Sequence, residues 1–116
     1  MKAQAIIEKH LPKEIVQELR SFSCGTDKVV TFAAWVAVKR NCAAEKYKPI
    51  NSCCRAHDTC YEQQKGQEDC DNVFCDCLIE MQKKNNERKC ERIVKGMCAV
   101  VKTFGEDAYK NSVKPQ

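Results

Sequence analysis

Apolar residues recur at helical spacing along most of the chain, and the signal is strongest near the C-terminal end. There they occupy the i, i+3, i+4, i+7, i+8 and i+11 positions of one helix face: Cys90, Ile93, Val94, Met97, Cys98 and Val101. Because residues at these intervals share one side of an α-helix, the pattern predicts an amphipathic helix packed against a core. We expect the polar tail after Phe104 to be loosely held.

Two segments nearer the N-terminus are also helical in period. Pro12 suits a first helical turn, and the pattern after it predicts a helix that runs to about Arg20. Thr26 or Asp27 would cap a second helix that continues through Ala37. The glycine between these segments marks the break.

The middle of the chain predicts a third helix, which carries several cysteines. We expect a loop at residues 46–50 around Pro49, after which Asn51 or Ser52 would cap the helix. One face of this helix presents four residues at the i, i+4, i+7 and i+8 positions: Cys53, His57, Cys60 and Tyr61. Asp58 falls on an adjacent stripe.

A fourth helix follows a polar turn at residues 63–68, and Asp71 or Asn72 would cap it. Asn85 and Asn86 suggest a break after it. No alternating run rich in Val, Ile and Thr is long enough to predict a strand. The fold class expected from the pattern is therefore all-α.

Composition places the chain among small disulfide-rich proteins. Its 116 residues suit one domain spanning 1–116, and the even count of ten cysteines indicates a disulfide scaffold. Such scaffolds persist in oxidising surroundings, so we expect a secreted, extracellular protein. Met1 is followed by a polar stretch, and we expect any signal peptide to be already missing from this numbering.

Hydropathy and charge narrow the possible partners. The longest apolar run, residues 29–38, is interrupted by Thr31 and is shorter than the roughly 20 residues of a membrane span, so we expect no transmembrane segment. The net charge of +4 favours anionic lipid surfaces or other acidic partners. We expect no nucleic-acid partner.

The stretch that carries chemistry is residues 53–61, which read Cys-Cys-Arg-Ala-His-Asp-Thr-Cys-Tyr. Histidine abstracts protons near neutral pH, so His57 is a candidate general base. Asp58 points from a different face of the helix and is suited to hold a hard cation. An ordinary surface His-Asp pair is one alternative. A zinc site is another, which the lack of matched CxxC motifs disfavours.

The same stretch resembles the CCxxHDxCY signature of the secreted phospholipases A2 at every fixed position. Cys70, Asp71 and Cys77 extend the match, since that family's second long helix begins with a Cys-Asp pair and has another cysteine seven residues after the first. The resemblance implies a small disulfide-rich fold in which two long antiparallel helices are cross-linked by disulfides.

The resemblance also implies a role for each site residue. His57 would activate a water molecule, Asp71 would orient its imidazole and Tyr61 would hydrogen-bond to Asp71. Asp58 would be the side-chain ligand of calcium, which polarises the ester carbonyl and stabilises its oxyanion. A competing register places Leu78 where the orienting aspartate belongs, and we reject it because it loses the seven-residue cysteine spacing. A capping role of Asp71 could coexist with the orienting one.

The calcium loop departs from the family pattern. The family's (Tyr/Trp)-Cys-Gly-x-Gly loop completes the calcium shell with backbone carbonyls. By this resemblance Ser23, Gly25 and Asp27 would be the matching ligands, although aspartate replaces the second glycine. We therefore expect Ca²⁺ to bind weakly, at Asp58 and this loop.

The chain is also longer than the family between two of its cysteines. Twenty-eight residues separate Cys24 from Cys53, and the excess contains an apolar helix at residues 32–38. We expect its aromatic residues, Phe32 and Trp35, to pack into the core, with membrane docking as the alternative.

The resemblance implies three disulfides: Cys24–Cys54, Cys53–Cys77 and Cys60–Cys70. Nine residues between the last pair leave no room for the small β-hairpin of many relatives. Cys90 and Cys98 would lie about 12 Å apart on one helix, too far to bond each other. Cys42 and Cys75 must partner them; we prefer Cys42 with Cys90 and Cys75 with Cys98, and the reverse pairing stays open.

We expect a secreted, calcium-dependent phospholipase A2 that hydrolyses the sn-2 ester of glycerophospholipids at a phospholipid membrane surface. The alternative is a catalytically weak or inactive phospholipase A2-like protein that binds lipid or receptor, or acts as a toxin-like interaction protein. A purely structural disulfide scaffold is a third possibility. The set of His57, Asp58, Tyr61 and Asp71 favours the enzyme, whereas Asp27 and the inserted helix favour the alternative.

Overall fold

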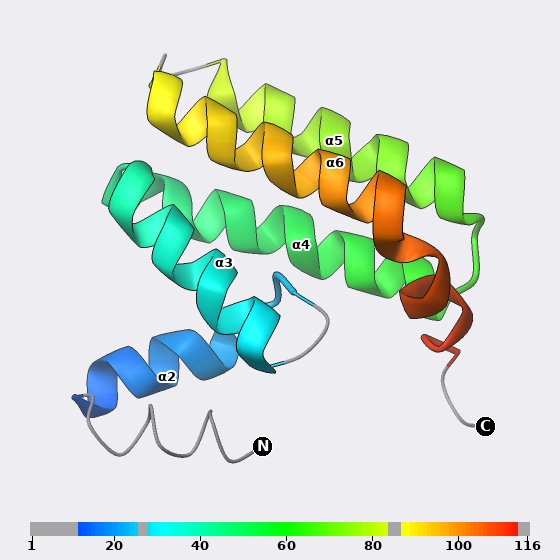
Figure 1. Ribbon diagram of the computed structural model, residues 1–116, viewed down its shortest axis with the longest axis horizontal. Coiled ribbons are helices and arrows are strands. Elements are labelled where there is room, and N and C mark those ends of the chain that lie inside the picture. The colour runs from blue at the N-terminus through cyan, green and yellow to red at the C-terminus, as the bar shows by residue number, and fades with distance from the viewer. Residues whose placement is uncertain (1–11, 26–27, 84–86, 114–116) are drawn as a thin grey trace.

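A computed structural model describes residues 12–25, 28–83 and 87–113 (Figure 1). Within these residues every regular element is helical, which confirms the all-α fold class expected from the sequence. The elements are α2 (Lys13–Ser21), α3 (Lys28–Asn41), the short 3₁₀ helix η1 (Ala44–Lys46), α4 (Tyr47–Glu62), α5 (Gln67–Gln82) and α6 (Arg88–Lys110).

The antiparallel pair of α4 and α5 forms the frame of the structure (Figure 1). A short turn joins the two helices, α6 packs along α5, and α3 contacts α6. Three disulfides hold this arrangement, two between α4 and α5 and one between α5 and α6: Cys53–Cys77, Cys60–Cys70 and Cys75–Cys98. The cross-linked antiparallel helices expected from the resemblance are therefore confirmed.

Two further disulfides attach the N-terminal half to this frame. Cys24, which follows α2, is bonded to Cys54 on α4, and Cys42, which follows α3, is bonded to Cys90 on α6. All ten cysteines lie in the described residues and none is free. The five predicted pairings are thus confirmed.

Half-cystines and apolar side chains together make the buried core. Its largest members include Phe22, Ile50, Phe74, Leu78 and Val94, each at most 5% exposed. A chain of this size buries a modest fraction of its surface, and the cross-links compensate for its small core by restricting the unfolded chain.

α3, the inserted helix, contributes to the same core. Trp35 is partly buried and packs against the core cluster, as predicted. Phe32 stacks on Trp35, with ring centroids 6.2 Å apart. Neither α3 nor any other helix in the described residues is long and apolar enough to cross a membrane.

The start of α4 corrects the loop predicted around Pro49. η1 leads directly into α4 at Tyr47, so Pro49 lies inside the first helical turn. Proline is tolerated there because the first N–H groups of a helix have no acceptor within the helix. Asn51 and Ser52 are therefore not caps. The buried Asn51 side chain instead accepts a hydrogen bond from the Ser23 N–H (2.6 Å).

The start of α5 corrects a second boundary. α5 begins at Gln67, directly after Gly66, so the turn is shorter than predicted. Gly66 has a φ of +109°, in the left-handed region that glycine adopts at low cost. Asp71 and Asn72 consequently lie in the second turn of α5 and do not cap it. The cap prediction was wrong because α5 begins before Asp71, whose carboxylate pairs with side chains of α4 instead.

The C-terminal tail corrects a third boundary. α6 continues to Lys110, although a loose tail was predicted after Phe104. Phe104 is 75% exposed, but the next residue, Gly105, is buried. Tyr109 packs edge-on against Tyr61 of α4. Contacts with α4 therefore order the last turns of α6, although the sequence of these turns is polar.

The C-terminal ends of α2 and α3 lie at or beyond their predicted positions. α2 ends within one residue of its predicted end, and α3 continues past Ala37 to Asn41. The predicted caps Thr26 and Asp27, and the predicted break at residues 85–86, lie outside the described residues.

Loop length should set how much each disulfide stabilises the fold. The Cys42–Cys90 bridge spans 48 residues and the Cys60–Cys70 bridge spans 10. Replacing Cys42 and Cys90 by alanine should lower the free energy of unfolding by about 4 kcal/mol, and replacing Cys60 and Cys70 by about 3 kcal/mol. Urea unfolding followed by circular dichroism measures both losses. A reversed order would mean that contacts in the folded state outweigh chain entropy.

Candidate functional site

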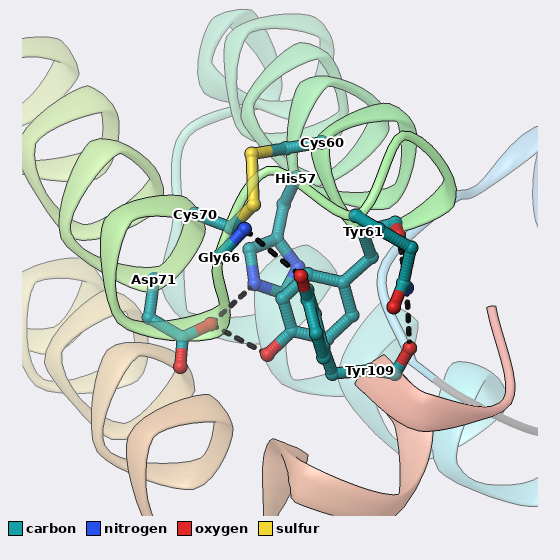
Figure 2. The surroundings of a disulfide bond; sticks show 8 residues. His57, Cys60, Tyr61, Gly66, Cys70, Asp71 and Tyr109 are labelled. Atoms are coloured by element: carbon teal, nitrogen blue, oxygen red, sulfur yellow. Dashed lines mark hydrogen bonds and ion pairs between the residues drawn. A yellow bond between two sulfur atoms is a disulfide. The ribbon is translucent and has the colours of Figure 1, made fainter. Parts of the chain in front are cut away.

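The site is built on the antiparallel pair, where His57 of α4 faces Asp71 of α5 (Figure 2). Nε2 of His57 lies 2.7 Å from Oδ1 of Asp71. Both residues are buried, with 8% and 3% of their surface exposed. A buried carboxylate is stable only when it is paired, so this contact compensates the charge of Asp71.

Tyr61, one turn after His57, is the second partner of Asp71. Its hydroxyl donates a hydrogen bond of 2.6 Å to the same Oδ1 atom (Figure 2). Burial, together with the hydrogen bond to Asp71 and its negative charge, raises the pKa of Tyr61 well above its ordinary value. The phenol therefore stays protonated and remains a donor.

The imidazole of His57 is held in one orientation by its neighbours. The rings of Tyr61 and Phe74 lie 4.2 Å and 4.6 Å from it, measured between centroids. Because an ionised carboxylate only accepts hydrogen bonds, Nε2 of His57 carries the proton shared with Asp71. Nδ1 then keeps its lone pair and can accept a proton.

Disulfides set the separation of the two helices beside this pair. Cys60 lies one turn after His57, and Cys70 immediately precedes Asp71. The bond between these cysteines fixes their Cα atoms 5.7 Å apart (Figure 2). This disulfide therefore helps to hold His57 and Asp71 at hydrogen-bonding distance.

Asp58 follows His57 in sequence but points from another face of α4, where it is exposed. Although the side chain reaches solvent, partial loss of hydration and the nearby negative charge of Glu62 raise the pKa of Asp58 to about 7. A bound cation would offset both effects. Carboxylate oxygen is also the donor that Ca²⁺ prefers, so the chemistry of Asp58 fits that ion.

Two of the predicted loop ligands, Ser23 and Gly25, flank Cys24, which is attached to the same stripe of α4. Cys24 is bonded to Cys54, one turn before Asp58, so the disulfide brings the loop to this part of the helix. Ser23 and Gly25 are described, whereas Asp27 lies outside the described residues. No group of three or more His, Cys, Asp or Glu side chains in the described residues could hold a metal. Further calcium ligands would be backbone carbonyls.

Gly25 can only be glycine in this backbone. Its φ is +112°, and a Cβ atom there would lie 2.7 Å from the backbone nitrogen of Thr31. The loop backbone is therefore packed against the first turn of α3. This close packing leaves no room for a side chain at position 25 and places Gly25 beside the first turn of α3.

A polar pocket opens on the α5 side of the site. Its volume is about 350 Å³, and it is lined by Gln67, Glu68, Asp71, Asn72 and Lys102. Sequence reasoning did not find Gln67, whose side chain hydrogen-bonds to the Tyr61 hydroxyl. It also missed Gly105 and Tyr109, because the segment that holds them reads as a polar tail.

Comparison with known proteins gives a similar protein for most of the chain. The sequence is 35% identical over 107 residues to a phospholipase A2-like protein of Caenorhabditis elegans. The match covers 92% of this chain and 59% of the relative, so the chain spans about three fifths of the relative's length. No family model matches the sequence, and no solved structure matches it. The match supports a phospholipase A2-like relationship along most of the chain.

The hydrogen bond to Asp71 should make Tyr61 unusually important for stability. Tyr61→Phe should lower the free energy of unfolding by about 2 kcal/mol, because it removes a donor from a buried charged acceptor. Tyr47→Phe is the matched control, since that hydroxyl donates to the neutral Glu18 carbonyl at 2.9 Å. It should cost about 1 kcal/mol. Equal losses in urea unfolding would contradict the special role of Asp71.

Proposed function

We propose that this protein is a secreted phospholipase A2-type hydrolase that cleaves the sn-2 ester of glycerophospholipids. The observation that carries the proposal is the buried contact between Nε2 of His57 and Oδ1 of Asp71, at 2.7 Å. It leaves one imidazole nitrogen free as a base, and it lies in a motif that resembles the secreted phospholipases A2. The similarity to a phospholipase A2-like relative supports the same class.

The residues of the chain divide the proton chemistry between them. Nδ1 of His57 takes a proton from the attacking water as the water adds to the ester carbonyl. Asp71 holds the imidazole in the required tautomer and stabilises the imidazolium that forms, as the orienting carboxylate of a serine triad does. Tyr61 keeps Asp71 in place through its hydroxyl. The proton on His57 then passes to the departing alcohol.

Calcium is the cofactor that this arrangement suits. Asp58 would hold it through its carboxylate, and Ser23, Gly25 and Asp27 through backbone carbonyls. When bound, the ion would polarise the ester carbonyl and stabilise its oxyanion. The raised pKa of Asp58, about 7, supports a cation site because it reflects a carboxylate whose charge is poorly compensated by the protein.

The location and substrate surface follow from charge and cross-linking. Five disulfides join all ten cysteines, which favours an oxidising, extracellular setting. A net charge of +4 favours association with anionic phospholipid surfaces.

The alternative is a phospholipase A2-like binding or toxin-like protein with little or no turnover. The contact of Gly25 with Thr31 favours it, because the first N–H groups of α3 carry partial positive charge. That charge would weaken the binding of a cation to the adjacent loop. Calcium titration by calorimetry, combined with turnover of mixed phospholipid vesicles, separates the two functions.

His57→Gln should reduce phospholipid hydrolysis by at least about a hundredfold, because it removes the general base. Release of fatty acid from mixed phospholipid vesicles measures the rate. His10→Gln, at the other histidine of the chain, is the matched control and should hydrolyse at the native rate. Native-rate hydrolysis by His57→Gln would exclude His57 as the base.

Calcium should bind weakly, with a dissociation constant on the order of 10⁻⁴ to 10⁻³ M, the range of extracellular modules. Asp58→Asn should abolish both the calorimetric binding signal and turnover, because it removes the charged ligand. Asp76→Asn, an exposed aspartate on α5, is the matched control and should leave both intact. Full activity of the native protein in excess chelator would contradict the calcium mechanism.

A further inference from the structure

The C-terminal end of α6 packs directly on the candidate site. The Tyr109 ring meets the Tyr61 ring edge-on, with centroids 5.0 Å apart and planes at 88° (Figure 2). Its hydroxyl accepts a hydrogen bond from the Gly66 N–H at 2.9 Å. Gly66 is the residue from which α5 starts, so Tyr109 connects α6 to both helices of the frame.

Gln64 adds a second connection in the same place. Its side-chain nitrogen donates to the backbone carbonyls of Tyr61 and Tyr109, at 2.7 Å each. α6 is therefore fixed against the α4–α5 turn by side-chain and backbone contacts. Its distance from Tyr61 is set by these contacts.

Gly105 lies one helical turn before Tyr109 and faces Tyr61. It is buried, and a Cβ atom at this position would lie 2.6 Å from the Tyr61 hydroxyl oxygen and 3.2 Å from Nε2 of Gln67. The hydroxyl therefore occupies space that any other residue at position 105 would take. Gly96, earlier in α6, has nothing within 4 Å of such an atom.

The Tyr61 hydroxyl is thus enclosed on three sides. The hydroxyl donates a hydrogen bond to Asp71, and the Gln67 side chain hydrogen-bonds to the hydroxyl. The α6 backbone at Gly105 is its third neighbour. A group at van der Waals contact on that side would force the phenol to move. A hydrogen bond of 2.6 Å to Oδ1 of Asp71 would then lengthen or break.

We propose that Gly105 is a positioning residue, whose missing side chain lets α6 hold the Tyr61 hydroxyl on Asp71 and so keeps the His57–Asp71 pair aligned. The effect on catalysis rests on the proposed function, whereas the effect on the Tyr61 hydroxyl does not. The contact with the Tyr61 hydroxyl, at 2.6 Å, is the severe one, whereas the contact with Gln67, at 3.2 Å, involves the end of a flexible side chain. The importance of Gly105 should therefore depend on the phenol oxygen being present.

A double-mutant cycle tests this dependence. The variants are Gly105→Ala, Tyr61→Phe and the two together, with Gly96→Ala as the matched glycine-to-alanine control in the same helix. Alanine favours helix over glycine, so Gly96→Ala should raise the thermal midpoint by a few degrees. Gly105→Ala should lower it in the native background. In the Tyr61→Phe background the same substitution should leave it unchanged or raise it, because the clashing oxygen is gone.

Turnover of mixed phospholipid vesicles gives the second readout. Gly105→Ala should lower kcat about tenfold, the value of one lost hydrogen bond to a charged group. KM should be unchanged, because the proposed function gives Tyr61 a role on Asp71 and none in binding substrate. Tyr61→Phe should lower kcat by a similar factor, and the double variant should lower it no further. Gly96→Ala should keep the native kcat.

Additive effects of Gly105→Ala and Tyr61→Phe in both readouts would overturn the proposal. If Gly105→Ala does not fold, the double variant should fold, and its failure to do so would also overturn it. A native protein without turnover would contradict the proposed function. The thermal cycle would in that case still decide the role of Gly105.

Discussion

The hydrogen bond between His57 and Asp71 is the interaction on which the rest of the site depends, and the disulfides make it possible. Burying a carboxylate and an imidazole between two helices is unfavourable unless the partners meet at hydrogen-bonding distance. The bonds Cys53–Cys77 and Cys60–Cys70 fix the spacing of α4 and α5 around that contact. The cross-links therefore stabilise a small core and also align the His57 and Asp71 side chains.

Two carboxylates in this small site have opposite environments, which suits them to different tasks. Asp71 is 3% exposed and accepts hydrogen bonds from two neighbouring side chains, so the protein itself compensates its charge. The side chain of Asp58 reaches solvent, but partial loss of hydration and the like charge of Glu62 both raise the pKa of its carboxyl. One carboxylate is thus suited to orienting an imidazole and the other to binding a cation from solution.

The turn between α4 and α5 is short, and α6 covers it. Tyr109 and Gln64 connect the end of α6 to this turn, and Gly105 lies against the Tyr61 hydroxyl. The polar C-terminal turns, which carry little core-forming sequence, thereby form part of the wall of the site. α6 thus helps to define the position of the Tyr61 side chain, which belongs to α4.

The helical period of the sequence determined the all-α class. The resemblance carried by residues 53–61 predicted His57, Asp58, Tyr61 and Asp71 as site residues, together with three of the five disulfides. The other two pairings were a preference, and Gln67, Gly105 and Tyr109 were not found from the sequence. Tertiary structure brought Asp71 to its partners, because only the packing of α5 against α4 places the His57 and Tyr61 side chains within hydrogen-bonding distance of its carboxylate. It also decided the start of α4 at Tyr47 and the length of α6. Local propensity is weak in each of these segments, and contacts between residues far apart in sequence supply the free energy that fixes them.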